Sequence, residues 1–175
     1  LGCAVVSTGC ASTNTLTGVL SAWQDGIPAV FISGQNTLKE TTRFTGKPVR
    51  SYGQQEADMV SIVDGITKYA VMITDPLSSR FEMEKALSLA REGRRGPVWI
   101  DIPLDIQNMR VEPEDLVGYD AETQPFAPDE SEMRELAQQL RAAKRPVILI
   151  GSGIKHAGAE AELAQFVERY RLPVV

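Results

Sequence analysis

Short runs of aliphatic and β-branched residues alternate along this chain with segments of helical periodicity, and this alternation limits the fold more than any other feature. Such alternation is typical of a parallel sheet whose strands are joined by crossover helices, the α/β class. We therefore expect a parallel sheet within residues 1–107. Its strands are predicted at four places: 4–7, 29–33, 69–73 and 98–102.

Helices are expected between these strands. Asn14 or Thr13 is expected to cap the first helix, and a short helix is expected at about 56–63. The polar segment 34–55 shows little periodicity, and a loop of this length is usually functional. A third helix is predicted to begin at Asp75-Pro76, a capping residue followed by proline. The apolar faces of the first and third helices are predicted to hold these residues: Leu16, Val19, Leu20 and Trp23, and then Leu77, Phe81, Met83, Ala86, Leu87 and Ala90.

The pattern changes after Pro103. Residues 110–128 combine proline, glycine and acidic side chains without a period, which is typical of a linker. A second, Rossmann-like domain is expected to begin at 129 with one β-α-β unit. Its parts are a helix, a strand at 146–150, a turn at 151–153, a helix and a strand at 172–175. A chain that starts at Leu1 and stops on a strand is expected to be an internal piece of a longer protein.

Composition and charge exclude several classes of protein. Of the 175 residues 43% are hydrophobic, enough for one domain or for parts of two. The net charge of −5 comes without a stripe of Lys and Arg, which argues against nucleic-acid binding. The longest apolar runs, of about five residues, are too short to cross a bilayer.

The two cysteines are expected to be reduced. If the chain between Cys3 and Cys10 is extended, their Cα atoms lie up to roughly 23 Å apart, at about 3.3 Å per residue. A disulfide requires Cα atoms within about 7 Å. Reduced thiols fit a cytoplasmic protein.

Three motifs have both functional and structural interpretations. The sequence Gly151-x-Gly153 after a strand is part of a dinucleotide fingerprint, but His156 replaces its third glycine. His156 is the only histidine, so no Ser-His-Asp or Cys-His set can be completed here, and it is interpreted as solvated. Asp101 and Asp105 flank a strand end, where they could serve a metal or, as we favour, cap a loop.

Residues 7–14 form the sharpest candidate for a binding loop. They leave the C-terminal end of a strand, are rich in small residues and enter a helix. Backbone N–H groups and small hydroxyls in such a loop allow close approach of a flat ligand. The residues alone leave ligand contact and tight packing equally open.

Several motifs, in the same order and at a similar spacing, resemble the large subunit of acetolactate synthase and its thiamine-diphosphate relatives. The likeness continues into Lys144 to Gly153 and covers nearly the whole chain. The motifs are Ser7-Thr8-Gly9-Cys10-Ala11-Ser12-Thr13-Asn14, Ile32-Ser33-Gly34-Gln35, Gln54-Gln55-Glu56, Ile66-Thr67-Lys68, and Gly96-Pro97-Val98-Trp99-Ile100-Asp101-Ile102-Pro103-Leu104-Asp105-Ile106-Gln107.

The resemblance implies a domain order and a cofactor. Residues 1–109 would be the C-terminal two-thirds of the domain that binds the pyrimidine ring of thiamine diphosphate, and 129–175 the start of the central domain. The activating glutamate and the Mg²⁺ ligands would lie outside the chain, so the isolated chain is expected to be inactive. FAD in the central domain is left open. The resemblance also implies a homodimer or homotetramer, with the cofactor site between subunits.

The resemblance also implies roles for particular residues. Thr8, Gly9, Cys10 and Asn14 match the loop that contacts the pyrimidine ring. Gln55 matches a glutamine near the reacting centre, and Lys68 a lysine at the substrate entrance. The alternative interpretation of Gln55 and Lys68, as solvated loop and helix-end residues, stays open.

The implied reaction is decarboxylation of pyruvate and transfer of the two-carbon unit to a second carbonyl, a step of branched-chain amino acid biosynthesis. This chain departs from the synthase pattern in that Cys10 replaces a proline, Ala11 a glycine and Gln54 a phenylalanine. These changes leave open another thiamine-diphosphate enzyme: a 2-keto acid or oxalyl-type decarboxylase, a glyoxylate carboligase or a sulfoacetaldehyde acetyltransferase. A hypothesis of another class is a nucleotide-binding module without catalysis, built on residues 146–175.

Overall fold

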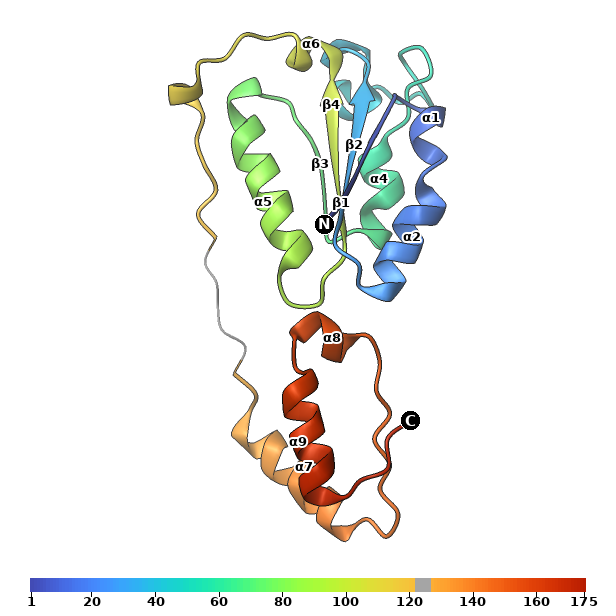
Figure 1. Cartoon of the computed structure of the whole chain (residues 1–175). Coiled ribbons are helices and arrows are strands. Elements are labelled where there is room, and N and C mark those ends of the chain that lie inside the picture. Colours follow the sequence, from blue (N-terminus) through green and yellow to red (C-terminus); the bar gives the residue numbers. More distant parts are fainter. Residues whose placement is uncertain (122–126) are drawn as a thin grey trace. The chain divides into compact units, whose positions relative to one another are not determined.

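The computed structural model describes residues 1–121 and 127–175, and the chain divides into two units, Leu1–Ala121 and Glu122–Val175 (Figure 1). Four strands form a wholly parallel sheet in the first unit, which confirms the predicted α/β class. In the order β1-β2-β4-β3, they are β1 (Gly2–Val6), β2 (Ala29–Gln35), β4 (Pro97–Pro103) and β3 (Tyr69–Met72).

The two central strands, β2 and β4, position the residues that matter below. They pair over seven residues, from Ala29 opposite Pro97 to Gln35 opposite Pro103, and this register sets Ser33 beside Asp101. Since all the strands are parallel, the C-terminal ends of β1, β2 and β4 lie at one edge of the sheet. In open α/β sheets, ligands bind outside this edge.

Helices cover both faces of the sheet (Figure 1). Helices α2 (Leu16–Asp25) and α4 (Met59–Val63) lie on one face, and α5 (Ser79–Arg91) lies on the other. Alternate residues of β4 point to opposite faces, as strand geometry requires. Trp99 therefore packs in the core under α2 and α4, where its ring stacks on Phe31 with centroids 5.6 Å apart. Its neighbours Val98 and Ile100 pack in the second core, under α5.

The start of the first helical region differs from the expectation. A separate short helix, α1 (Cys10–Thr13), precedes α2, and neither Thr13 nor Asn14 caps α2, so that prediction was wrong. The physical reason is that both residues are used within α1. The Thr13 hydroxyl donates to the Cys10 carbonyl, and the Asn14 N–H donates to the Ala11 carbonyl.

The buried face of α2 is narrower than predicted. Val19 and Ala22 are buried, whereas Leu20 and Trp23 are 41% and 38% exposed. The buried face of α5 agrees better with the prediction, because Ala86 and Ala90 are fully buried. That helix follows η3 (Pro76–Ser78), and the Asp75 carboxylate accepts a hydrogen bond from the N–H of Leu77, as the capping prediction requires.

The segment between β2 and α4 contains short helices rather than one loop. They are η1 (Leu38–Glu40) and α3 (Thr42–Thr45). The predicted helix at 56–63 begins only at α4 and continues into η2 (Asp64–Ile66). Glu56 stays outside it because its buried carboxylate accepts hydrogen bonds from the N–H and hydroxyl of Thr42 and the N–H of Tyr52. After β4 follow two short elements, α6 (Leu104–Gln107) and η4 (Pro113–Asp115).

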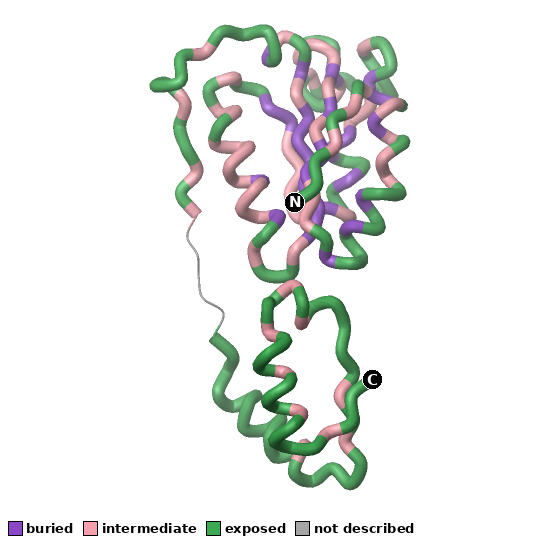
Figure 2. Tube along the Cα trace, in the orientation of Figure 1, coloured by how far each residue is buried: buried purple, intermediate pink, exposed green. Residues whose placement is uncertain are grey.

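The second unit contains helices α7 (Glu130–Ala142), α8 (Gly153–Ala157) and α9 (Glu160–Tyr170). Asp129 caps α7 by accepting from the N–H groups of Ser131 and Glu132, as predicted. The two predicted strands pair in parallel, but only through one isolated bridge, between Ile148 and Val174. Figure 2 shows that buried residues concentrate in the first unit, and none of residues 127–175 is fully buried.

Part of the predicted linker, residues 122–126 of 110–128, lies outside the described residues. Within the ranges that the structure does describe, no helix has the length and apolar character that a membrane span requires.

Candidate functional site

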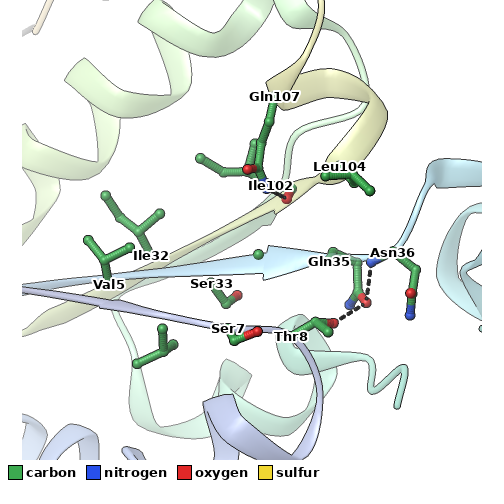
Figure 3. Close-up of a pocket in the computed structure, with 12 residues that line it drawn as sticks. Val5, Ser7, Thr8, Ile32, Ser33, Gln35, Asn36, Ile102, Leu104 and Gln107 are labelled. Carbon is green, nitrogen blue, oxygen red and sulfur yellow. Dashed lines mark hydrogen bonds between the residues drawn. The ribbon is translucent and has the colours of Figure 1, made fainter. Parts of the chain in front are cut away.

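A pocket of about 480 Å³, here called the strand-end pocket, opens beside the C-terminal ends of β1, β2 and β4 (Figure 3). Aliphatic side chains form one part of its wall: Val5, Val6, Ile32, Ile102 and Leu104. Polar side chains gather where the strands end: Ser7, Thr8, Gln35, Asn36 and Gln107. This combination suits a flat ligand with apolar faces and a polar edge.

Gln35 joins the loops around the pocket. Its Oε1 atom accepts hydrogen bonds from the Thr8 hydroxyl, at 2.8 Å, and from the backbone N–H of Asn36, at 3.0 Å (Figure 3). Its Nε2 atom donates to the carbonyl of Ala57, at 2.9 Å, and to Asp101 Oδ2, at 3.0 Å. A single buried amide thus connects the loop after β1, the end of β2 and the segment that leads into α4.

Asp101 lies behind Gln35 and is only 1% exposed. It also accepts a hydrogen bond from the Ser33 hydroxyl, and Ser33 in turn accepts from the indole N–H of Trp99, at 2.8 Å. Burial raises the pKa of Asp101 to about 6, although the hydrogen bonds from Ser33 and Gln35 favour the ionised form.

Gly9 and Gln55 are in direct backbone contact. A Cβ atom on Gly9 would lie 1.4 Å from the Gln55 carbonyl oxygen, so no larger residue fits at position 9. Both residues have positive φ angles, 57° for Gly9 and 58° for Gln55. A non-glycine residue in this region is strained by roughly 1–2 kcal/mol, and such strain is often found at functional sites.

The segment that holds Gln55 in this conformation is well anchored. The Asn36 side-chain amide donates to the Gln54 carbonyl at 3.0 Å, and the Glu56 carboxylate binds Thr42 and Tyr52 as described above. Burial acts to raise the pKa of Glu56, but the hydrogen bonds from Thr42, Tyr52 and Gly53 outweigh it and hold the pKa below its ordinary value.

Of the predicted cofactor-loop residues and Gln55, Thr8 lines the pocket, and Gly9, Cys10, Asn14 and Gln55 do not. Cys10 is exposed at the first position of α1, and Asn14 is exposed just after its end. The buried Ser12 fixes α1 against the strand by donating to the carbonyl of Ser7. The structure therefore brings together Thr8, Gly9 and Gln55, with Cys10 beside them.

Lys68 lies at the other edge of the sheet. Its N–H donates to the carbonyl of Pro97, the first residue of β4, and the seven residues from Pro97 to Pro103 span about 20 Å. Its Nζ donates to the carbonyl of Glu92, and its aliphatic chain lies beside Gly96. Burial lowers the pKa of Lys68, while the Glu92 carboxylate acts in the opposite direction. The structure does not bring Lys68 to the strand-end pocket.

The other motifs have structural roles. Asp105 accepts hydrogen bonds from the N–H of Leu38 at both carboxylate oxygens, each 3.1 Å away, which is the predicted loop cap. Asp101 is a strand residue and not a loop cap. Across residues 1–121 and 127–175, no group of three or more His, Cys, Asp or Glu side chains converges on a metal site. His156 is partly exposed within α8.

Sequence reasoning did not assign Gln35, Ser33 or Trp99 to the site. A signal was present, because Ser33 and Asp101 are polar residues inside otherwise apolar strands. Buried polar groups are normally hydrogen-bonded, so two such residues on neighbouring strands indicate a network.

Comparison with known proteins identifies both parts of the chain. Residues 1–62 match the family described as "Thiamine pyrophosphate enzyme, N-terminal TPP binding domain", and residues 133–175 match "Thiamine pyrophosphate enzyme, central domain". The chain is 34% identical over 179 residues to the acetolactate synthase large subunit of Lactococcus lactis, covering 100% of this chain and 29% of that protein. It is also 34% identical over 182 residues to the isozyme 3 large subunit of Escherichia coli, covering 100% of this chain and 30% of that protein.

A solved structure supports the fold. The chain superimposes on benzoylformate decarboxylase from Polynucleobacter necessarius with a TM-score of 0.78 and 23% identity, covering 98% of this chain and 31% of that one. The chain thus spans about 30% of the length of the curated relatives named above.

Proposed function

The chain belongs to the thiamine pyrophosphate enzymes, and on this basis we propose that it is part of a 2-keto acid carboligase of the acetolactate synthase type. Thiamine diphosphate, when bound, supplies the carbon nucleophile that decarboxylates a 2-keto acid such as pyruvate and passes the two-carbon unit to a second carbonyl. The observation that carries the proposal is the strand-end pocket, with Thr8 at its polar edge and the Gly9–Gln55 contact beside it.

The proposal assigns domains to the two units. Residues 1–109 form part of the pyrimidine-binding domain, and 129–175 begin the central domain, with a linker at 110–128. The two family matches fall on either side of this linker, and the chain divides into its two units at 121/122.

The residues present fit the pyrimidine ring. The aliphatic wall of the pocket would contact the face of the ring, and Thr8 would meet its polar edge. Gly9 acts indirectly, because its missing side chain lets the Gln55 backbone approach, and Gln55 then orients a polar group of the substrate. Cys10 and Asn14 complete the proposed set around α1.

Other parts of the active enzyme are proposed to lie outside this chain. They are the glutamate that activates the ring and the ligands of the Mg²⁺ ion that holds the diphosphate. The whole protein is proposed to be a homodimer or homotetramer with the cofactor between subunits, and FAD in the central domain would be detected by its visible absorption. A cytoplasmic location agrees with the free thiols of Cys3 and Cys10.

One observation favours a second candidate, a related thiamine-diphosphate enzyme with another donor or acceptor. Cys10, Ala11 and Gln54 differ from the synthase pattern, and Cys10 and Gln54 flank the Gly9–Gln55 contact in sequence. A change of residue beside the reacting centre alters which substrate fits without altering the cofactor.

Product analysis tests the function and separates the two candidates. The full-length polypeptide that contains residues 1–175 is supplied with thiamine diphosphate, Mg²⁺ and pyruvate. Acetolactate is the expected product, with a second 2-keto acid as an alternative acceptor. Release of free aldehyde without carboligation would favour the decarboxylase candidate, and absence of thiamine-dependent turnover of any 2-keto acid would contradict both.

A further inference from the structure

Two side-chain amides at the C-terminal end of β2 bind the peptide chain on both sides of Gln55. The amide of Asn36 donates to the carbonyl of Gln54, at 3.0 Å, and the amide of Gln35 donates to the carbonyl of Ala57, at 2.9 Å. Figure 3 shows the two donors next to each other where β2 ends. The acceptors lie one residue before and two residues after Gln55, so the strand end holds this segment at two points, here called the amide clamp.

The Gln35 amide of the clamp has one orientation that satisfies its neighbours. Its oxygen accepts from the backbone N–H of Asn36, at 3.0 Å, and its NH₂ group also donates to Asp101 Oδ2, at 3.0 Å. Rotation by half a turn would set the amide oxygen against two acceptors, the Asp101 carboxylate and the Ala57 carbonyl. Since Gln35 and Asp101 are 5% and 1% exposed, that orientation would leave buried polar atoms unpaired.

The Asn36 amide lies against its loop at close range. An ideal Cβ position on Gly53 is 2.7 Å from Asn36 Nδ2 and 2.7 Å from the carbonyl oxygen of Glu40. A side chain at position 53 would therefore push the amide away from Gln54. The bond to Gln54 belongs to a closely packed turn and is not a loose surface contact.

The backbone of Gln55 requires such support. Its φ angle of 58° is unfavourable for a residue with a side chain, and strain of this kind persists only where the surrounding structure imposes it. The Gln55 side chain is exposed, so its own packing does not supply the constraint. The constraint comes from the two clamped carbonyls beside it and from the contact with Gly9.

We propose that Gln35 and Asn36 are positioning residues for Gln55, which hold its strained backbone so that its side chain meets the substrate in one direction. Asp101 acts one step further away, by fixing the Gln35 amide. The inference rests on the proposed function, in which Gln55 orients a polar group of the 2-keto acid. The clamp acts on the substrate through Gln55, so its effect disappears when the Gln55 side chain is removed.

A double-mutant cycle on the full-length polypeptide tests this dependence. Turnover of pyruvate is measured at saturating thiamine diphosphate and Mg²⁺, and the readout is kcat/KM. Asn36→Ala and Gln55→Ala should each lower kcat/KM by about tenfold, and the double variant should be no worse than Gln55→Ala alone. Asn108→Ala is the matched control, because it removes a bond of the same kind, from a side-chain amide to the Leu104 carbonyl at 2.8 Å, and should leave kcat/KM unchanged.

Hydrogen exchange follows the clamp without turnover. Asn36→Ala and Gln35→Met should each speed exchange at the backbone amides of residues 54–57 by about tenfold, because each variant removes one of the two bonds. Asn108→Ala should not change exchange there. Should Gln35→Met fail to fold, Asn36→Ala against Asn108→Ala still decides whether the clamp exists.

The outcomes are distinct. Additive losses in the cycle would mean that Asn36 acts on a ligand directly, and unchanged exchange at 54–57 in Asn36→Ala would mean that it holds nothing; either result overturns the proposal. If Gln55→Ala turns over pyruvate as well as the unmodified protein does, the inference falls and the proposed function stands. If the unmodified protein turns over no 2-keto acid with thiamine diphosphate, the proposed function falls, and the role of the clamp towards substrate falls with it.

Discussion

The backbone of Gln55 occupies the space where a side chain on Gly9 would begin, with the Gln55 carbonyl oxygen 1.4 Å from an ideal Cβ position. Two loops separated by 45 residues of sequence can therefore pack this closely only because Gly9 has no side chain. The requirement for glycine at position 9 arises from this contact, whether or not a ligand is bound.

The first prediction concerns Gly9. Gly9→Ala combines a positive φ angle with a clash against backbone, and we expect the free energy of unfolding to fall by about 3 kcal/mol or more. Gly46→Ala is the matched control, since Gly46 has a φ of 64° with nothing within 4 Å of its Cβ position. In the Gly46→Ala variant the free energy of unfolding should fall by only about 1 kcal/mol. If urea denaturation gave equal losses of unfolding free energy for the two variants, the contact between Gly9 and the Gln55 backbone would be contradicted.

The second prediction concerns the pH dependence of stability that Asp101 produces. Its folded pKa, about 6, lies above the ordinary value of 3.8, so the ionised carboxyl disfavours the folded state. The cost is absent below pH 3.8, grows as the pH rises towards 6 and is complete above it. Asp101→Asn removes this dependence. We expect the unfolding free energy of the unmodified chain to fall relative to the variant by on the order of 3 kcal/mol across this window.

Denaturation curves at several pH values between about 4 and 7 test the second prediction. Asp58 and Arg43 also affect the pKa of Asp101, in opposite directions, and both are retained in the variant. Parallel stability profiles for the two proteins would mean that Asp101 does not titrate in this range.

The third prediction concerns Glu56, whose carboxylate holds the segment before α4. Glu56→Gln leaves one of the N–H donors of Thr42 or Tyr52 facing an NH₂ group, and we expect a loss of about 1–3 kcal/mol. Glu40→Gln is a suitable control, because among the described residues that exposed carboxylate accepts a side-chain hydrogen bond only from the Thr37 hydroxyl. Hydrogen exchange should report faster opening around residues 51–57 in the Glu56 variant alone.

The fourth prediction concerns Lys68. Lys68→Met keeps the aliphatic contact with Gly96 and removes the hydrogen bond to Glu92, so stability should fall by about 1 kcal/mol. Cofactor affinity should not change, because the residue lies at the opposite edge of the sheet from Thr8. Reduced binding of thiamine diphosphate in this variant would place Lys68 at the cofactor site after all.

The elements that follow from local sequence were predicted well. The four strands were found within two residues at each end, because their apolar runs are bounded by polar or glycine-rich segments. The helical start at η3, which leads into α5, was also predicted, since Asp75 and Pro76 are adjacent and act within one turn. Such features depend on residues that are close together in the sequence.

The network behind the pocket could not be predicted in the same way. Gln35 has hydrogen-bond partners 22, 27 and 66 residues away, and only the register of β2 against β4 brings Ser33 beside Asp101. The prediction of which α2 residues are buried was partly wrong for a related reason. Helical spacing gives a face that includes Leu20 and Trp23, but the position of the helix on the sheet decides which edge of that face is covered.

The stacking of Phe31 on Trp99 gives the protein an optical property. Of its two tryptophans, Trp99 is fully buried and Trp23 is 38% exposed, so an aqueous quencher should extinguish the emission of one and spare the other. The shielded indole donates its N–H to the hydroxyl that also binds Asp101. We therefore expect its emission wavelength to respond to the charge on that carboxyl, so that a Trp23→Phe protein would carry a built-in fluorophore that reports from behind the pocket without any attached dye.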